Sequence, residues 1–99
     1  MSPPAKTESA SSLHREVTVL NRQGVHARPS ASFVKLASQF QSDVFIEKDG
    51  ETINGKSIMG LLMLAAGPGS RLRIVCTGPD ARTALEQLCA LVDAKFGED

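Results

Sequence analysis

The sequence predicts a single α+β domain, a two-layer open-faced sandwich with three helices on one face of a four-stranded, mostly antiparallel sheet. Three observations support this class. The chain has 99 residues, enough for one hydrophobic core and no more. Stretches with the two-residue period of strands alternate with stretches of helical period. Their order is strand, helix, strand, strand, short helix, strand, helix.

Residues 1–13 are predicted to form a disordered arm, and residues 14–99 to form the domain. The start of the arm is rich in Pro, Ser and charge and has too little apolar surface to fold. It lacks the apolar centre of a secretory signal, and no apolar run in the chain is long enough to cross a bilayer. We therefore expect a cytoplasmic protein that does not associate with membranes.

The first strand is expected at residues 16–20, which are rich in β-branched side chains. The first helix is expected from Ser30 to Phe40, directly after a loop, with Pro29 near its first turn. His26 or Ala27 then lies near the N-cap. The apolar arc of this helix consists of Phe33, Val34, Leu36, Ala37 and Phe40.

Residues 44–47 and 52–54 are predicted to pair as a hairpin, because they flank an Asp-Gly turn. Ser57, a favoured N-cap residue, precedes a short apolar helix over residues 58–66. Projection of this helix places Ile58, Leu61, Leu64 and Ala65 together on the core side. It places Met59, Leu62 and Met63 on the opposite side.

A half-buried strand is predicted at residues 70–77, where apolar and polar residues alternate. The last helix starts near Asp80, which suits an N-cap or a partner for the helix dipole. Its expected buried stripe contains Ala81, Ala84, Leu85, Leu88, Leu91, Val92 and Phe96. Cys76 and Cys89 fall on apolar patterns and are expected to be core residues; a disulfide between them is the alternative, which a reducing cytosol disfavours.

Composition argues against several functions. The formal net charge is zero and Trp and Tyr are absent, so nucleic acid is not an expected partner. His14 is the only other histidine, and no His, Cys or acidic spacing suits a metal, so no metal or other cofactor is expected. We expect His14 to be a solvated residue at a strand edge.

The loop from Gly24 to Pro29 contains the candidate functional residues. Gly24 permits a tight turn, and the following helix directs unpaired N–H groups and the positive end of its dipole towards His26. A neutral imidazole is a competent nucleophile towards phosphorus, and Arg28 adds a cation nearby. The loop therefore combines a nucleophile with a phosphate site at Ala27 and Arg28. On spacing alone, however, a histidine before a helix is more often a surface or capping residue.

The segment Gly24-Val25-His26-Ala27-Arg28-Pro29-Ser30 resembles the phosphorylation motif of the HPr family, and Lys56-Ser57-Ile58-Met59-Gly60 resembles the family's regulatory serine segment. The similarity runs from about Glu16 to the C-terminus. It implies the HPr sandwich and a phosphoryl relay protein rather than an enzyme. His26 would accept a phosphoryl group on Nδ1 from Enzyme I, which is itself phosphorylated by phosphoenolpyruvate. It would then pass the group to EIIA-type proteins. Arg28 would stabilise the negative charge of the phosphoryl group.

The resemblance also implies that HPr kinase/phosphorylase could modify Ser57. A phosphate there would place charge beside an apolar surface and weaken docking. We expect partners to dock on the exposed side of the short helix and on the polar side of the first helix. This docking face consists of Ala31, Lys35, Ser38, Ile58, Met59, Leu62 and Met63.

Two pathways stay open within the family. One is sugar transport, which the Lys56–Gly60 segment favours. The other is a regulatory binding module of the nitrogen-related branch, switched by phosphorylation, which Leu61-Leu62-Met63-Leu64 favours. A generic interaction domain with an incidental histidine is the third hypothesis. A monomer is expected in each case.

Overall fold

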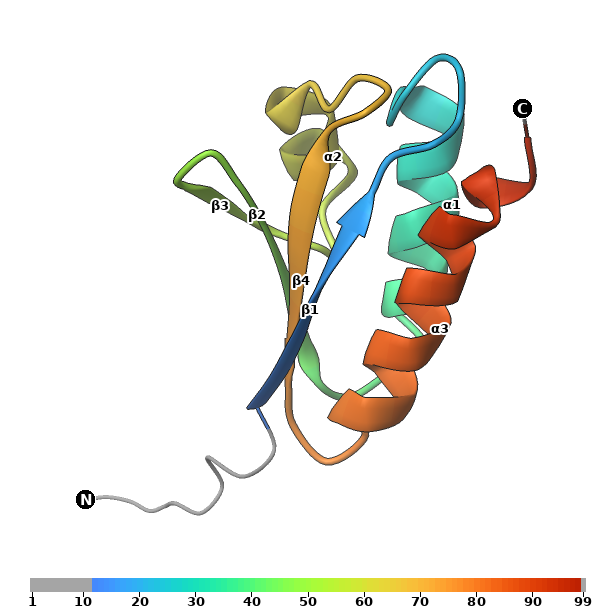
Figure 1. Ribbon diagram of the computed structural model, residues 1–99. Helices are drawn as coiled ribbons and strands as arrows, with labels where there is room; N and C mark the ends of the chain where they lie inside the picture. The colour runs from blue at the N-terminus through green and yellow to red at the C-terminus, as the bar shows by residue number, and fades with distance from the viewer. Residues whose placement is uncertain (1–11, 99) are drawn as a thin grey trace.

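The computed structural model describes residues 12–98, which form two layers (Figure 1). The sheet contains strands β1 (Ser12–Thr18), β2 (Asp43–Lys48), β3 (Glu51–Asn54) and β4 (Arg71–Thr77). Their order is β1-β4-β2-β3, and all three pairs are antiparallel. The helices are α1 (Ala27–Ala37), α2 (Ile58–Leu64) and α3 (Ala81–Asp93), and they lie on one side of the sheet. The predicted fold class is confirmed.

Side-chain alternation along β4 separates the two faces of the sheet. Leu72, Ile74 and Cys76 are buried against the helices, as predicted. Arg71 and Arg73 lie on the open face, where Arg71 contacts Glu16 at 3.2 Å. The open face carries these charged side chains together with the partly exposed Phe45, and the core lies between the sheet and the helices. Both cysteines are buried free thiols, as predicted, and burial raises the pKa of Cys76 to about 11.

Several predicted boundaries are wrong by two to four residues. The first strand begins at Ser12 rather than residue 16, so residues 12 and 13 belong to β1 and not to the arm; residues 1–11 lie outside the described part. Helix α1 starts three residues early, at Ala27, and ends at Ala37 rather than Phe40. Pro29 at its third position forfeits no helical hydrogen bond, so it is compatible with the early start.

Helix α2 ends at Leu64 rather than Ala66, because Ala65 adopts the left-handed conformation at φ 51°. The projection of its core side is partly wrong. Leu61 and Leu64 are buried, but Ile58 is 43% exposed and Ala65 is exposed as well. Ile58 is the first residue of a seven-residue helix and Ala65 lies outside it, so the core covers neither.

Asp80 occupies the N-cap of α3, as predicted, but its carboxylate does not bond the amides of that helix. It accepts hydrogen bonds from the backbone N–H groups of Gln41 and Ser42, each at 2.9 Å. A hydrogen bond from the Ser42 hydroxyl, the largest effect, together with these backbone contacts lowers the pKa of Asp80. The side chain thus joins the start of α3 to the turn before β2. Among residues 12–98, no helix has both the length and the apolar character needed to cross a bilayer.

Candidate functional site

His26 is the N-cap residue of α1, as the sequence predicts, and its backbone is extended at φ −88°. The preceding loop is fixed at two points. The Gly24 N–H donates to the Asn21 carbonyl at 3.1 Å, and the Val25 N–H donates to the Ala66 carbonyl at 2.8 Å. Because Ala66 lies two residues after the end of α2, the histidine loop is tied to the segment that follows that helix.

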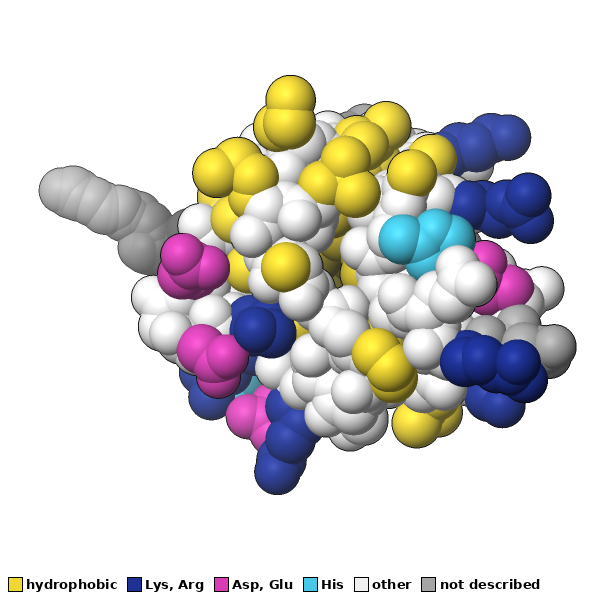
Figure 2. Space-filling view, turned by 90° about the horizontal axis from the view of Figure 1, so that it is seen from above, with side chains coloured by type: hydrophobic (Ala, Val, Ile, Leu, Met, Phe, Trp, Pro, Cys, Tyr) yellow, Lys and Arg dark blue, Asp and Glu magenta, His cyan; other side chains and the backbone are white. Residues whose placement is uncertain are grey.

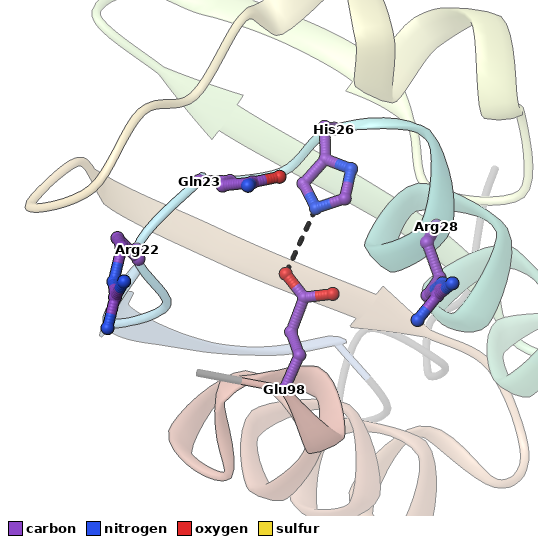
Figure 3. A pocket seen from close by; sticks show the side chains of 5 residues that line it. All are labelled: Arg22, Gln23, His26, Arg28 and Glu98. Carbon is purple, nitrogen blue, oxygen red and sulfur yellow. Dashed lines mark hydrogen bonds and ion pairs between the residues drawn. The ribbon is translucent and has the colours of Figure 1, made fainter.

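The imidazole of His26 has one nitrogen bonded and one open. Nε2 lies 3.0 Å from Oε1 of Glu98, while the other ring nitrogen points away from Glu98, towards the first turn of α1 (Figure 3). Within residues 12–98, Nδ1 has no hydrogen-bond partner. The side chain is 36% exposed, so an incoming protein can reach it.

Glu98 reaches the histidine because the chain turns sharply after α3. Lys95, Phe96 and Gly97 have φ values of 59°, 56° and 78°, which carry the chain back towards the start of α1. The same Glu98 oxygen accepts from Nδ2 of Asn21 at 3.0 Å. Hydrogen bonds from His26, the larger effect, and from Asn21 hold the pKa of Glu98 below its usual value.

A surface cavity of about 390 Å³ lies beside the ring and is lined by Arg22, Gln23, His26, Arg28 and Glu98 (Figure 3). The first turn of α1 adds backbone donors, because the N–H groups of Ala27 and Arg28 have no acceptor within the helix. Pro29 has no N–H, and the Ser30 N–H already donates to the His26 carbonyl at 3.0 Å. Two amides and two arginine side chains can therefore face an anion at this site.

Sequence reasoning brought His26, Ala27 and Arg28 together but missed Glu98 and Asn21. Glu98 is 72 positions from His26 along the chain, and it follows the end of the last helix. No periodicity or motif links residues so far apart. Asn21 follows the predicted first strand, and no sequence pattern marks it as part of the site, although it is fully buried and its Nδ2 also donates to the Gly24 carbonyl at 2.6 Å.

Ser57 is the N-cap of α2, as predicted, and its hydroxyl accepts from the Gly60 N–H at 3.0 Å. The apolar side chains predicted to be exposed on α2 are exposed: Met59 by 67%, Leu62 by 40% and Met63 by 73%. Hydrophobic side chains gather on the face seen in Figure 2, and a histidine lies beside them. Ala31 and Lys35 on α1, which contacts α2, and Ser38 at the C-cap of α1 are exposed.

His14 is exposed on β1, an edge strand, as predicted. Over residues 12–98, no group of three or more His, Cys, Asp and Glu side chains is placed to hold a metal ion.

Comparison with known proteins gives a consistent result. Residues 13–94 match the family model described as PTS HPr component phosphorylation site. The chain is 44% identical over 86 residues to phosphocarrier protein HPr of Cupriavidus necator, which covers 87% of this chain and 97% of that protein. It is 42% identical to phosphocarrier protein NPr of Shewanella violacea, over 87% of this chain and 94% of that one.

Solved structures agree with the sequence comparisons. The crystal structure of HPr-C-His from Thermoanaerobacter tengcongensis superposes with a TM-score of 0.85 at 38% identity, covering 88% of this chain and 98% of that one. A crystal structure of an HPr dimer from the same organism has a TM-score of 0.71 at 40% identity, over 83% of this chain and 94% of that one.

Proposed function

This chain belongs to the HPr family of the phosphotransferase system, and from that premise we propose that His26 is the residue that carries the phosphoryl group. The observation that supports His26 is its ring geometry. One nitrogen is held by Glu98, and the other is open beside the free amides of α1. The phosphoryl group would come from Enzyme I and pass to EIIA-type proteins.

The transfer is a direct displacement. The Nδ1 lone pair of His26 forms the bond to phosphorus as the bond from phosphorus to Enzyme I breaks, and the proton on Nε2 stays in place. The Ala27 and Arg28 amides and the Arg28 guanidinium then face the phosphoryl oxygens. An exposed helix N-terminus stabilises an anion by only about 0.3–1 kcal/mol. Such weak stabilisation suits a cytoplasmic carrier, rather than an enzyme, because the group must leave again.

The test is phosphorylation in solution. With Enzyme I and phosphoenolpyruvate, the protein is expected to gain one acid-labile phosphoryl group, measured by mass spectrometry of the intact chain. A protein that stays unmodified beside a known HPr that is labelled would contradict the proposal.

Arg28→Ala is expected to slow phosphoryl transfer up to about fivefold, because an exposed ion pair contributes about 0.2–1 kcal/mol. Arg28 is exposed and lines the cavity beside His26. The measurement is the initial rate of phosphorylation by Enzyme I. Arg82→Ala removes the same charge from an exposed position on α3 and should leave the rate unchanged. Equal rates for the two variants would mean that Arg28 does not assist the transfer of the phosphoryl group.

We also propose that partners dock on the face formed by α2 and α1. Its residues are Ala31, Lys35, Ser38, Ile58, Met59, Leu62 and Met63. Exposed methionines adapt to differently shaped partners, which suits a carrier that binds both a donor and several acceptors. The docking face lies next to the histidine loop, since the Ala66 carbonyl, two residues after α2, accepts from the Val25 N–H.

Ser57→Asp is expected to raise the KM for Enzyme I, because it adds charge next to Ile58 and Met59 on the docking face. The hydroxyl of Ser57 already sits at the first turn of α2, so a phosphate from HPr kinase/phosphorylase could be held there without unfolding the helix. Thr83→Asp places the same charge on an exposed part of α3 and is the control. An unchanged KM for Ser57→Asp would argue against a serine switch.

The nitrogen-related branch is the second candidate, supported by the similarity to an NPr protein. Rates of phosphorylation by the Enzyme I of each branch distinguish the two. We further propose that the protein acts as a monomer, which light scattering tests; its similarity to an HPr solved as a dimer makes this measurement necessary.

A further inference from the structure

We infer that Glu98 is a positioning residue for His26: it binds the proton on Nε2 and so directs the lone pair of Nδ1 towards the incoming phosphorus. This inference rests on the proposed function of His26. Its basis is the 3.0 Å contact between Glu98 Oε1 and His26 Nε2. A carboxylate can only accept, so this contact requires a proton on Nε2, and in the neutral ring Nδ1 is then the unprotonated nitrogen.

Asn21 holds the Glu98 carboxylate in place. Asn21 is fully buried, and its Nδ2 donates both to the Gly24 carbonyl at 2.6 Å and to Glu98 Oε1 at 3.0 Å. Both partners are acceptors, which fixes the orientation of the amide. The contacts therefore form a chain from a buried side chain, through a carboxylate, to the imidazole. Carboxylates orient histidine in this way in hydrolase triads and at metal sites.

The backbone supports the same conclusion. Lys95 and Phe96 are not glycines, yet both lie in the left-handed region, at φ 59° and 56°. Non-glycine residues adopt this region at a cost, and such outliers are concentrated at functional sites. Phe96 packs against the hydrophobic core, which anchors the turn. The result of this turn is that Glu98 lies within hydrogen-bond distance of the histidine.

The carboxylate also has an electrostatic role in the transfer. When Nδ1 bonds to phosphorus while Nε2 keeps its proton, the ring acquires a positive charge. Glu98 then faces that charge directly, whereas Nδ1, which would carry the phosphoryl group, lies on the other side of the ring, towards α1 (Figure 3). One carboxylate therefore stabilises the phosphorylated ring from the side opposite Nδ1.

The test uses the full chain carrying Glu98→Ala, with Glu86→Ala as a matched control. Glu86 is exposed on α3, so its removal changes the net charge equally without touching the site. The first readout is the imidazole Nε2–H signal in ¹H–¹⁵N NMR spectra above the pH at which the ring is protonated. We expect this signal in the wild type and in Glu86→Ala, and its loss through exchange with water in Glu98→Ala.

The second readout is the rate of phosphorylation by Enzyme I, expected to fall about two- to fivefold in Glu98→Ala, as for the loss of an exposed ion pair. Glu98→Gln keeps an acceptor oxygen and should retain the N–H signal with an intermediate rate. An unchanged signal or an unchanged rate in Glu98→Ala would overturn the inference. A wild-type protein that accepts no phosphate would instead overturn the proposed function, while the N–H signal would still report on the contact.

Discussion

The His26→Ala protein is expected to accept no phosphoryl group from Enzyme I and phosphoenolpyruvate. The substitution removes the nitrogen that forms the bond to phosphorus, and neither Ala27 nor Arg28 can replace it as a nucleophile. The loss should therefore be complete rather than partial. The measurement is the mass of the intact protein after incubation, with acid treatment to show that any added group is labile.

The control for this variant is His14→Ala, which removes the other of the two histidines in the chain. His14 is exposed on β1, and its loss should leave phosphorylation at the wild-type rate. His26→Ala should also remain folded, because the His26 side chain makes no capping hydrogen bond to α1. We expect its free energy of unfolding to change by no more than about 1 kcal/mol. A labelled His26→Ala protein would refute the assignment.

The elements of the fold were predictable because each has a local pattern. The alternation of Leu72, Ile74 and Cys76 predicts a strand whatever its neighbours are. The Asp-Gly pair at residues 49 and 50 predicts the hairpin turn, and both residues do have positive φ. Element ends depend instead on capping and on contacts with other segments. Residues 12–15 pair with β4, which no pattern within those residues reveals.

The site was predictable only where it is continuous in sequence. His26 and Arg28 share one helix start, so a motif could identify both. The Glu98 contact depends on the length of α3 and on three successive left-handed residues after it. Neither Lys95 nor Phe96 favours that conformation, so the sequence gives no signal for the turn. The docking face is intermediate. Helical projection predicted the exposure of Met59 and Met63, but it grouped Ile58 with the buried side chains, because projection ignores that the core does not cover the first residue of a short helix.

Gly24→Ala is expected to damage both the stability of the fold and the histidine loop. Gly24 has φ 72°, where a side chain is disfavoured by about 1–2 kcal/mol. A Cβ atom there would lie 2.5 Å from the Ala66 carbonyl oxygen and 2.8 Å from the Gly67 Cα. Both are backbone atoms, so the clash is relieved only by moving one of the two loops. We expect the free energy of unfolding to fall by about 2–4 kcal/mol in total.

Gly67→Ala provides a matched control from the opposite side of the same contact. A Cβ atom on Gly67 meets nothing within 4 Å, and its φ is not positive, so this variant should keep wild-type stability in urea unfolding. Moving the loops in Gly24→Ala also lengthens the 2.8 Å bond from Val25 to Ala66, which ties the residue before His26 to the end of α2. Phosphorylation of folded Gly24→Ala should therefore be slower than that of Gly67→Ala. Equal stability and equal rates for the two variants would mean that this close approach does not position the histidine.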